Sequence, residues 1–196
     1  TNSKKMLKNK VLVRKMVGIE TAGSLNILFT DKTGTITNGK MEVISILDGS
    51  LNEYTNINEL LPSYRQILID SIIYNNDSEY DSTTNKIIGG NITDKALLSF
   101  AGQNKKDTIK IIDKIMFNSQ NKYSISIIEK NNKKIKLIKG APDVLLKYTT
   151  NYIDENGKSK YLDKEKLMSI IKEKTNKGIR AIAISTSQSI YPTDNI

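Results

Sequence analysis

The sequence contains no cysteine, no long apolar run and no signal peptide, and each absence narrows what the chain can be. Without cysteine it has no disulfide and no thiolate metal site, which fits a reducing compartment. No apolar run approaches the roughly 18 residues of a membrane-spanning helix, and no long apolar segment follows the early lysines as in a signal peptide. We therefore expect the 196 residues to form a soluble chain of one domain, or one domain with part of another.

The charge is unbalanced, with 30 Lys and Arg against 21 Asp and Glu and a net charge of +9. Such an excess indicates either a nucleic-acid surface or a solvated exterior rich in lysine. The lysines are scattered, and the sequence has no zinc finger, heptad repeat or RNA-recognition aromatic signature. We therefore predict no nucleic-acid partner, and keep nucleic-acid binding as an alternative that strongly salt-dependent DNA binding would support.

The most informative stretch is residues 31–37, Asp-Lys-Thr-Gly-Thr-Ile-Thr. The apolar run 25–29 before it predicts a short buried strand, and Gly34 indicates a loop after that strand. Sheets of α/β proteins place reactive groups at the ends of their parallel strands. The order of strand and loop therefore predicts a reactive carboxylate at Asp31.

Three residues of this stretch fit phosphoryl transfer. The Asp31 carboxylate can attack the γ-phosphate of ATP and become an aspartyl-phosphate. Lys32 can neutralise phosphate charge, and the Asp31 carboxylate and Thr33 carbonyl are hard oxygens suited to Mg²⁺. A phosphate-binding loop overlaps at residues 34–40, but Met41 stands where Ser or Thr would place a hydroxyl on Mg²⁺. We therefore predict that Asp31, Lys32 and Thr33 are catalytic, with Asp31 and Thr33 as metal ligands.

The stretch 31–37 resembles the phosphorylation signature of the P-type ATPases, cation pumps that pass through an aspartyl-phosphate. Soluble phosphatases of the haloacid-dehalogenase type, which the pumps' phosphorylation domain resembles, usually carry a second Asp two residues later as general acid and base. Thr33 stands at that position and cannot shuttle a proton near neutral pH. The resemblance therefore implies a pump whose aspartyl-phosphate persists, with such a phosphatase as an alternative.

Four further segments are similar to the nucleotide-binding domain of these pumps and follow the family's order. They are residues 90–97 (GNITDKAL), 117–122 (FNSQNK), 139–143 (KGAPD) and 178–183 (GIRAIA). The resemblance implies an ATP site with Asp94 at the adenine amino group, Phe117 stacked on adenine, Lys122 facing phosphate, Lys139 deep in the pocket, Gly140 allowing close backbone approach and Arg180 on the phosphates. Each type of residue also has a structural interpretation, namely a first-turn Asp favoured by the helix dipole, a core Phe, a surface Lys and a strand-edge Arg.

The Lys-Gly-Ala-Pro segment at 139–142 is similar to the calcium, sodium–potassium, proton and magnesium branches of the family, and we favour a calcium-pump-like one. The family's Thr-Gly-Asp and Gly-Asp-Gly-x-Asn-Asp segments do not occur. The resemblance thus implies an excised cytoplasmic fragment: the start of the phosphorylation domain at 1–41, the nucleotide-binding domain at 42–190 and a truncated return segment at 191–196. The implied partners are ATP, Mg²⁺ and the remainder of the same pump, meaning the rest of the phosphorylation domain, the actuator domain and the membrane helices.

The function that this resemblance implies is ATP binding at the cytoplasmic face of a membrane, in a pump that couples ATP hydrolysis to ion transport. We expect the soluble fragment by itself to bind nucleotide without turnover. A stand-alone, non-catalytic nucleotide-binding regulatory module is the alternative from a different class.

The expected fold is α/β, with a twisted antiparallel sheet flanked by helices and an incomplete haloacid-dehalogenase-like segment before it. Apolar spacing predicts helices at 63–74, at 94–101 with Thr93 as N-cap, at 142–148 and from Asp163 to Gly178. The valine and isoleucines of 41–47 predict a strand, and 179–185 is the expected last strand. Alternation at 124–129 and 134–139 predicts a hairpin around Asn131-Asn132, into which the segment 110–117 leads. The polar stretches 48–58 and 75–85 predict loops, the second of them mobile.

Overall fold

The computed structural model describes residues 2–15, 17–103, 105–106 and 108–187. The chain divides into two compact units, Thr1–Gly39 and Lys40–Ile196. The predicted return segment at 191–196 lies outside the described residues. Among the helices of the described ranges, none has both the length and the apolar composition needed to cross a membrane.

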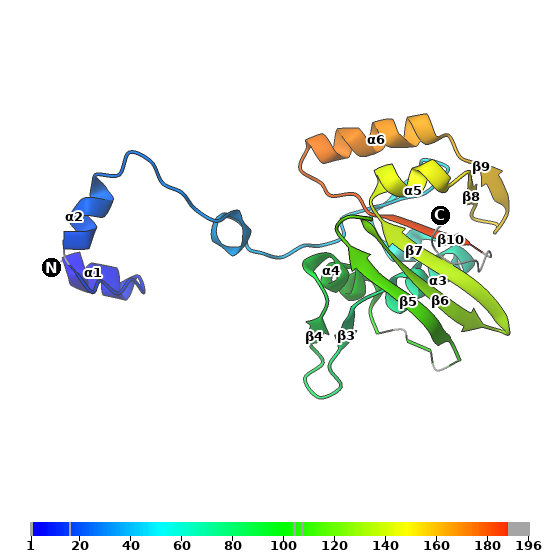
Figure 1. The fold of residues 1–196 in the computed structure, drawn as a ribbon, viewed down its shortest axis with the longest axis horizontal. Helices are drawn as coiled ribbons and strands as arrows, with labels where there is room; N and C mark the ends of the chain where they lie inside the picture. The colour runs from blue at the N-terminus through cyan, green and yellow to red at the C-terminus, as the bar shows by residue number, and fades with distance from the viewer. Residues whose placement is uncertain (1, 16, 104, 107, 188–196) are drawn as a thin grey trace. The chain divides into compact units, whose positions relative to one another are not determined.

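The first unit consists of short helical segments joined by irregular chain (Figure 1). These are α1 (Asn2–Lys8), α2 (Val17–Gly23) and a single π-helical turn, η1 (Lys32–Ile36). The buried strand predicted at 25–29 is wrong, because these residues form no strand and Phe29 is 93% exposed. A strand needs neighbours for its backbone hydrogen bonds, and the described part of this unit contains no other strand. The haloacid-dehalogenase-like character of this segment stays a prediction.

The second unit is built on a four-stranded antiparallel sheet with the strand order β10-β7-β6-β5. Lys130 pairs with Lys133, so Asn131-Asn132 is the two-residue hairpin turn that the sequence predicts. Both asparagines have positive φ angles, 52° and 59°, as a primed hairpin turn requires. The predicted antiparallel sheet is confirmed; its strands are β5 (Lys110–Asn118), β6 (Tyr123–Lys130), β7 (Lys133–Gly140) and β10 (Ala183–Ser187).

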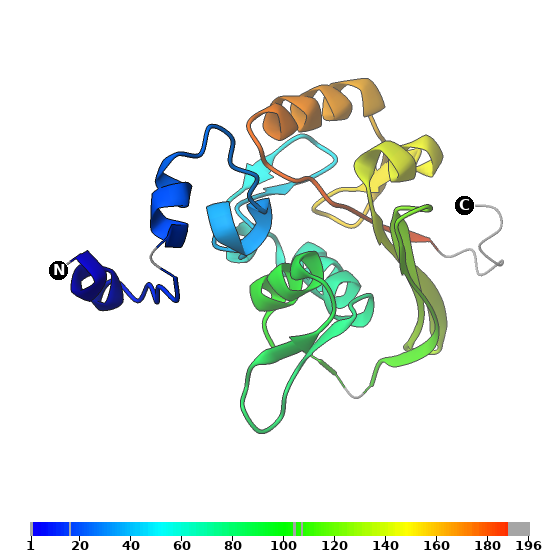
Figure 2. The same ribbon diagram turned by 60° about the vertical axis from the view of Figure 1, so that its left-hand side comes forward.

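Two helices, α3 (Pro62–Tyr74) and α4 (Ile92–Ala101), cover one face of this sheet (Figure 2). Tyr74 of α3 packs with Ile128 of β6 and Leu137 of β7 in a buried cluster. A second cluster joins the two helices to β10 through Ile72, Leu97 and Ile184. Each helix is therefore anchored to the sheet by apolar side chains, which fixes where its ends lie.

The opposite face carries α5 (Pro142–Tyr148), with α6 (Lys164–Asn176) beside it (Figure 1). Leu145 of α5 packs on Ile138, and because successive strand residues point to opposite faces, Ile138 and its neighbour Leu137 belong to different clusters. Gly178, with a φ of 81°, follows the end of α6 as predicted. The left-handed conformation there suits glycine because it has no Cβ.

The other elements in the described part of this unit are three short hairpins and one 3₁₀ turn. They are β1 (Ile46–Leu47) with β2 (Glu53–Tyr54), β3 (Ser78–Tyr80) with β4 (Ile87–Gly89), β8 (Asn151–Ile153) with β9 (Ser159–Tyr161), and η2 (Ile57–Glu59). The predicted strand 41–47 is too long, and the predicted loops 48–58 and 75–85 each contain a strand. Strands of two or three residues are too short to show an alternation in the sequence.

Two predicted element boundaries are also wrong. The N-cap of α4 is Asn91 instead of Thr93, because the Asn91 side chain accepts a hydrogen bond from the Asp94 amide. The last strand begins at Ala183 instead of Ile179, because Ala183 is the first residue that pairs with β7, opposite Gly140. The predicted cap of α6 is confirmed, since Asp163 accepts from the Lys166 amide. Side-chain oxygens of this kind satisfy amides that have no partner inside the helix.

Candidate functional site

The ends of all four strands of the main sheet meet near Gly140. Gly140 pairs with Tyr123 at the start of β6 and with Ala183 at the start of β10, and Tyr123 pairs with Asn118 at the end of β5. Five predicted nucleotide-binding residues lie at this end: Phe117, Lys122, Lys139, Gly140 and, just before β10, Arg180. The fold thus brings together residues that are up to 63 positions apart in the chain, between Phe117 and Arg180.

Phe117 and Lys139 lie in one row across the sheet. A register shift in β5 places Met116 and Phe117 opposite the single residue Ser124, and Ser124 pairs with Lys139. Because neighbouring strands are about 4.8 Å apart, the backbones of Phe117 and Lys139 are about 10 Å from each other. Phe117 is 47% exposed, so it is not sealed in the core.

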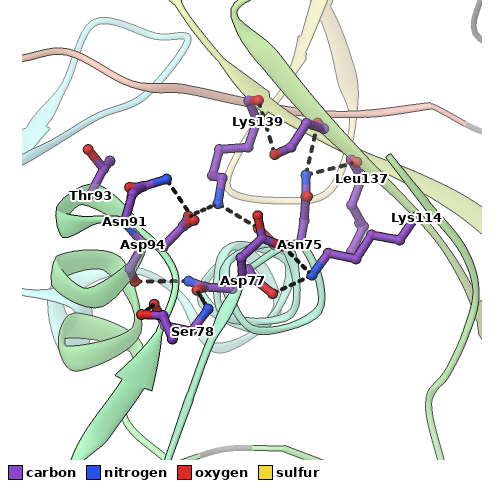
Figure 3. A network of polar contacts seen from close by, with 12 residues as sticks. Asn75, Asp77, Ser78, Asn91, Thr93, Asp94, Lys114, Leu137 and Lys139 are labelled. Atoms are coloured by element: carbon purple, nitrogen blue, oxygen red, sulfur yellow. Dashed lines mark hydrogen bonds and ion pairs between the residues drawn. The ribbon is translucent and has the colours of Figure 1, made fainter. Parts of the chain in front are cut away.

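The Lys139 ammonium is buried and forms an ion pair with Asp94 (Figure 3). Lys139 is 6% exposed and Asp94 is 1% exposed. The ammonium also donates a hydrogen bond of 2.7 Å to the backbone carbonyl of Asn75. Burying a charge is costly unless the charge is paired and hydrogen-bonded, and here both conditions are met.

Two helix ends also favour this ion pair. Asn75 is the C-cap of α3, so its carbonyl belongs to the negative end of the helix dipole. Asp94 lies in the first turn of α4, at the positive end of that helix. A second lysine, Lys114, donates to the Asn76 carbonyl at 2.5 Å and pairs with Asp77 at 2.6 Å (Figure 3). Two ammonium groups therefore hold successive carbonyls beyond the end of α3.

Three hydrogen bonds hold Asp94 in place besides the ion pair. Its amide donates to the Asn91 side-chain oxygen at 3.0 Å, and Asn91 Nδ2 donates to its second carboxylate oxygen at 3.0 Å. Asn76 Nδ2 donates to its backbone carbonyl, also at 3.0 Å. A carboxylate has about four acceptor positions, and Lys139 and Asn91 use two of them in these contacts. The carboxylate therefore keeps acceptor capacity, but at 1% exposure it is not open to an amino group from solvent in this structure, and the adenine contact stays a prediction.

Asn75 and Asn76 are site residues that the sequence did not reveal. The prediction of a mobile loop over 75–85 is wrong at its start, because Asn75 is 1% and Asn76 is 8% exposed. Asn75 Nδ2 donates to the carbonyls of Ser124 and Leu137, at 3.1 Å each. Asparagine after a helix ordinarily indicates a turn, and its burial here depends on strands 49 and 62 residues away.

Gly140 is required by a close approach of backbone to backbone. A Cβ atom at this position would lie 2.5 Å from the Lys122 carbonyl oxygen and 2.8 Å from Tyr123 Cα. The amide after it, at Ala141, donates to that same Lys122 carbonyl at 2.9 Å. The sequence predicted a close approach to a ligand, whereas the structure shows a close approach to the turn before β6.

The two remaining cations lie at the edges of the site. The Lys122 ammonium is 3.8 Å from Asp143, and both side chains are more than half exposed, so this pair contributes little to stability. Arg180 donates to the Thr93 hydroxyl at 3.3 Å, which places its guanidinium at the start of α4, one residue from Asp94. Both side chains are exposed and free to meet an anionic ligand from solvent.

The predicted catalytic residues belong to the first unit. Asp31 and Lys32 are exposed, with Asp31 in irregular chain directly before η1 and Lys32 as its first residue. Thr33 lies within η1, and its side chain is outside the described part of the chain. Their roles in phosphoryl transfer and in Mg²⁺ binding stay predictions.

Comparison with known proteins shows the family. The model of the P-type ATPase cytoplasmic domain N matches residues 64–193, about two thirds of the chain. The chain therefore belongs to the P-type ATPases, and this part of it is their cytoplasmic domain N.

Calcium-transporting ATPases are among the relatives. The chain is 31% identical to one from Listeria monocytogenes over 190 residues, which cover 91% of the chain and 21% of the relative. It is 32% identical to plasma membrane-type calcium-transporting ATPase 10 of Oryza sativa, covering 92% of the chain and 20% of that protein. It is also 32% identical to calcium-transporting ATPase 1 of Saccharomyces cerevisiae, covering 79% and 18%. The chain thus spans about a fifth of the length of these relatives.

Proposed function

We propose that this chain is the ATP-binding part of a calcium-transporting P-type pump. The observation that carries the proposal is the convergence of the predicted residues at one end of the sheet, around the buried pair of Lys139 and Asp94. Sequence resemblance selected these residues without reference to their positions in space. These residues come from the start of α4, from β5 and β7, from the turn before β6 and from the segment before β10, and a shared ligand would account for their position at one end of the sheet.

The residues at this end of the sheet suit the parts of ATP. Phe117 is 47% exposed and would supply an aromatic ring for adenine, and stacking of this kind is worth about 1–3 kcal/mol per base. Asp94 has acceptor capacity for the adenine amino group. Lys122 and Arg180 are exposed cations, and a planar guanidinium suits bidentate contacts to phosphate.

In the whole pump, we propose that the ATP held here gives its γ-phosphate to Asp31. The carboxylate attacks phosphorus in line, the bond from phosphorus to the bridging oxygen breaks, and ADP leaves with that oxygen. Mg²⁺ bound by the Asp31 carboxylate and the Thr33 carbonyl would neutralise phosphate charge, and Lys32 would add a second positive charge.

The rest of the same pump would convert this phosphorylation into ion movement. It comprises the remaining phosphorylation domain, the actuator domain and the membrane helices, with this chain on the cytoplasmic face of the membrane. The names of the relatives favour calcium as the transported ion.

The test is an ATP titration of the 196-residue chain followed by NMR amide shifts. We expect affinity near millimolar, about −4 kcal/mol, because one stacking contact and a few exposed charges carry the binding. Phe117→Ala should weaken it by about 1–3 kcal/mol. The matched control is Tyr161→Ala, which removes an 80% exposed ring from β9. If both variants bind ATP as the wild type does, Phe117 does not stack on adenine and the proposed site is wrong.

A further inference from the structure

Three buried polar atoms behind the candidate site have no hydrogen-bond partner among the described residues. They are Ser71 Oγ, Asn75 Oδ1 and Ser126 Oγ. Their residues are among the most buried of the described chain, with Ser71 and Asn75 1% exposed and Ser126 fully buried. A buried polar group without a partner costs free energy comparable to a lost hydrogen bond. Three such atoms in one region therefore need a common explanation.

The three atoms belong to α3, to its C-cap and to β6. Asn75, the C-cap of α3, follows Ser71 by four residues, a spacing that brings two residues to the same side of a helix. Ser126 lies two residues after Ser124 on β6, on the same side of the sheet. Asn75 Nδ2 already reaches the Ser124 carbonyl and the carbonyl of Leu137, the residue paired with Ser126. Asn75 therefore lies directly over this part of the β6–β7 pair.

A second contact fixes how α3 runs along β6. One residue before Ser71, Asp70 pairs with Lys130 at the far end of β6. The Asp70 and Asn75 contacts therefore tether the chain segment that contains Ser71 to β6 at two points. Ser126 lies between these two points on β6 and carries an unpartnered hydroxyl.

We propose that one ordered water molecule binds between Ser71, Asn75 and Ser126, and that it makes Asn75 a positioning residue for Lys139. Buried waters typically make about three hydrogen bonds to otherwise unsatisfied polar groups. The two hydroxyls can each donate or accept, and Asn75 Oδ1 can only accept. The water donates to Asn75 and to one serine and accepts from the other, so all three atoms are satisfied.

The water acts on the candidate site through Asn75. With its oxygen held by the water and its nitrogen by two strand carbonyls, the Asn75 side chain is fixed at both ends. That fixes the backbone at the end of α3, whose carbonyl accepts from the Lys139 ammonium at 2.7 Å. The water thereby orients the ammonium that the proposed function assigns to the nucleotide pocket, and in this respect the inference rests on that function.

The experiment uses the 196-residue chain without nucleotide, so its result does not depend on ATP binding. In the wild type we expect cross-relaxation between a long-lived water and the Asn75 side-chain amide, and a resolved ¹H–¹⁵N signal from the slowly exchanging Lys139 ammonium. In Ser71→Ala/Ser126→Ala the water signal should disappear and the ammonium hydrogens should exchange about five- to tenfold faster. The matched control is Ser169→Ala, which removes an exposed hydroxyl from α6.

Two results would overturn the inference. In the wild type, absence of a long-lived water would show that the hydroxyls pair with each other or with nearby carbonyls, and this holds even if the double variant fails to fold. In a folded double variant, an unchanged ammonium signal would show that the water has no influence on Lys139. An ATP titration of the same samples separates the two proposals: if the water and ammonium signals are present but ATP does not bind, the proposed function fails alone.

Discussion

The buried ion pair of Lys139 and Asp94 makes a sharp prediction about stability. Lys139→Met keeps the length and most of the volume of the side chain but removes the ammonium. Asp94, which is 1% exposed, is then left with the Asn91 side-chain amide as the partner that its carboxylate keeps among the described residues. The charge has lost its counterion in a place that water does not reach.

The expected loss is large for one substitution. Removing one partner of a buried ion pair typically costs about 3–5 kcal/mol, because the other charge stays buried and uncompensated. Domains are stable by about 5–15 kcal/mol in total, so Lys139→Met should remove about a fifth or more of the free energy of unfolding. Adding Asp94→Asn removes the remaining charge and keeps the contact to Asn91. The double variant should therefore be more stable than Lys139→Met alone.

Urea unfolding followed by circular dichroism measures these differences, since the sequence contains no tryptophan for fluorescence. The matched control is Lys177→Met, which breaks the exposed pair with Glu173 on the surface of α6. Exposed pairs contribute little, so the control should unfold at the wild-type urea concentration. The reasoning is refuted if Lys139→Met unfolds where the control does, or if the double variant is no more stable than the single one.

Three further predictions follow from the structure. Gly140→Ala should lower the free energy of unfolding by about 1–3 kcal/mol, because the added Cβ would lie 2.5 Å from the Lys122 carbonyl oxygen. The control Gly23→Ala has nothing within 4 Å of the added Cβ and should leave the stability unchanged. Equal urea midpoints for the two variants would contradict the close approach at Gly140. Burial raises the pKa of Tyr64 from 10.0 to about 12, so folding keeps this phenol protonated. The stability that the protonated phenol contributes is therefore present below pH 10 and is lost as the pH rises toward 12. The tyrosinate absorbance should show one late-titrating group that Tyr64→Phe removes; loss of a group with an ordinary pKa instead would speak against its burial. Incubating the chain with radiolabelled ATP and Mg²⁺ should give no acid-stable, hydroxylamine-sensitive label on Asp31, because this exposed residue follows no strand that would position it; label at Asp31 would show that the site is assembled.

Local patterns predicted the parts of the fold that depend on residues close together in the chain. The Asn131-Asn132 turn, the cap at Asp163 and the glycine after α6 are confirmed because each depends on residues within a few positions. The strand at 25–29 failed for the opposite reason. Its apolar composition predicts burial, but burial needs partner strands, and the described part of the first unit offers none.

The sequence by itself determined the family and the identity of the candidate residues, because short motifs carry the chemistry of a site in their residue types. Only the tertiary structure decided which polar side chains are buried and what holds them. The Lys139 ammonium meets partners 45 and 64 residues earlier in the chain, at Asp94 and Asn75. Ser71 and Ser126 carry no sequence signal at all, since serine is common on exposed surfaces. Their burial follows from how α3 lies on the sheet, and the packing of apolar side chains across long separations decides that placement.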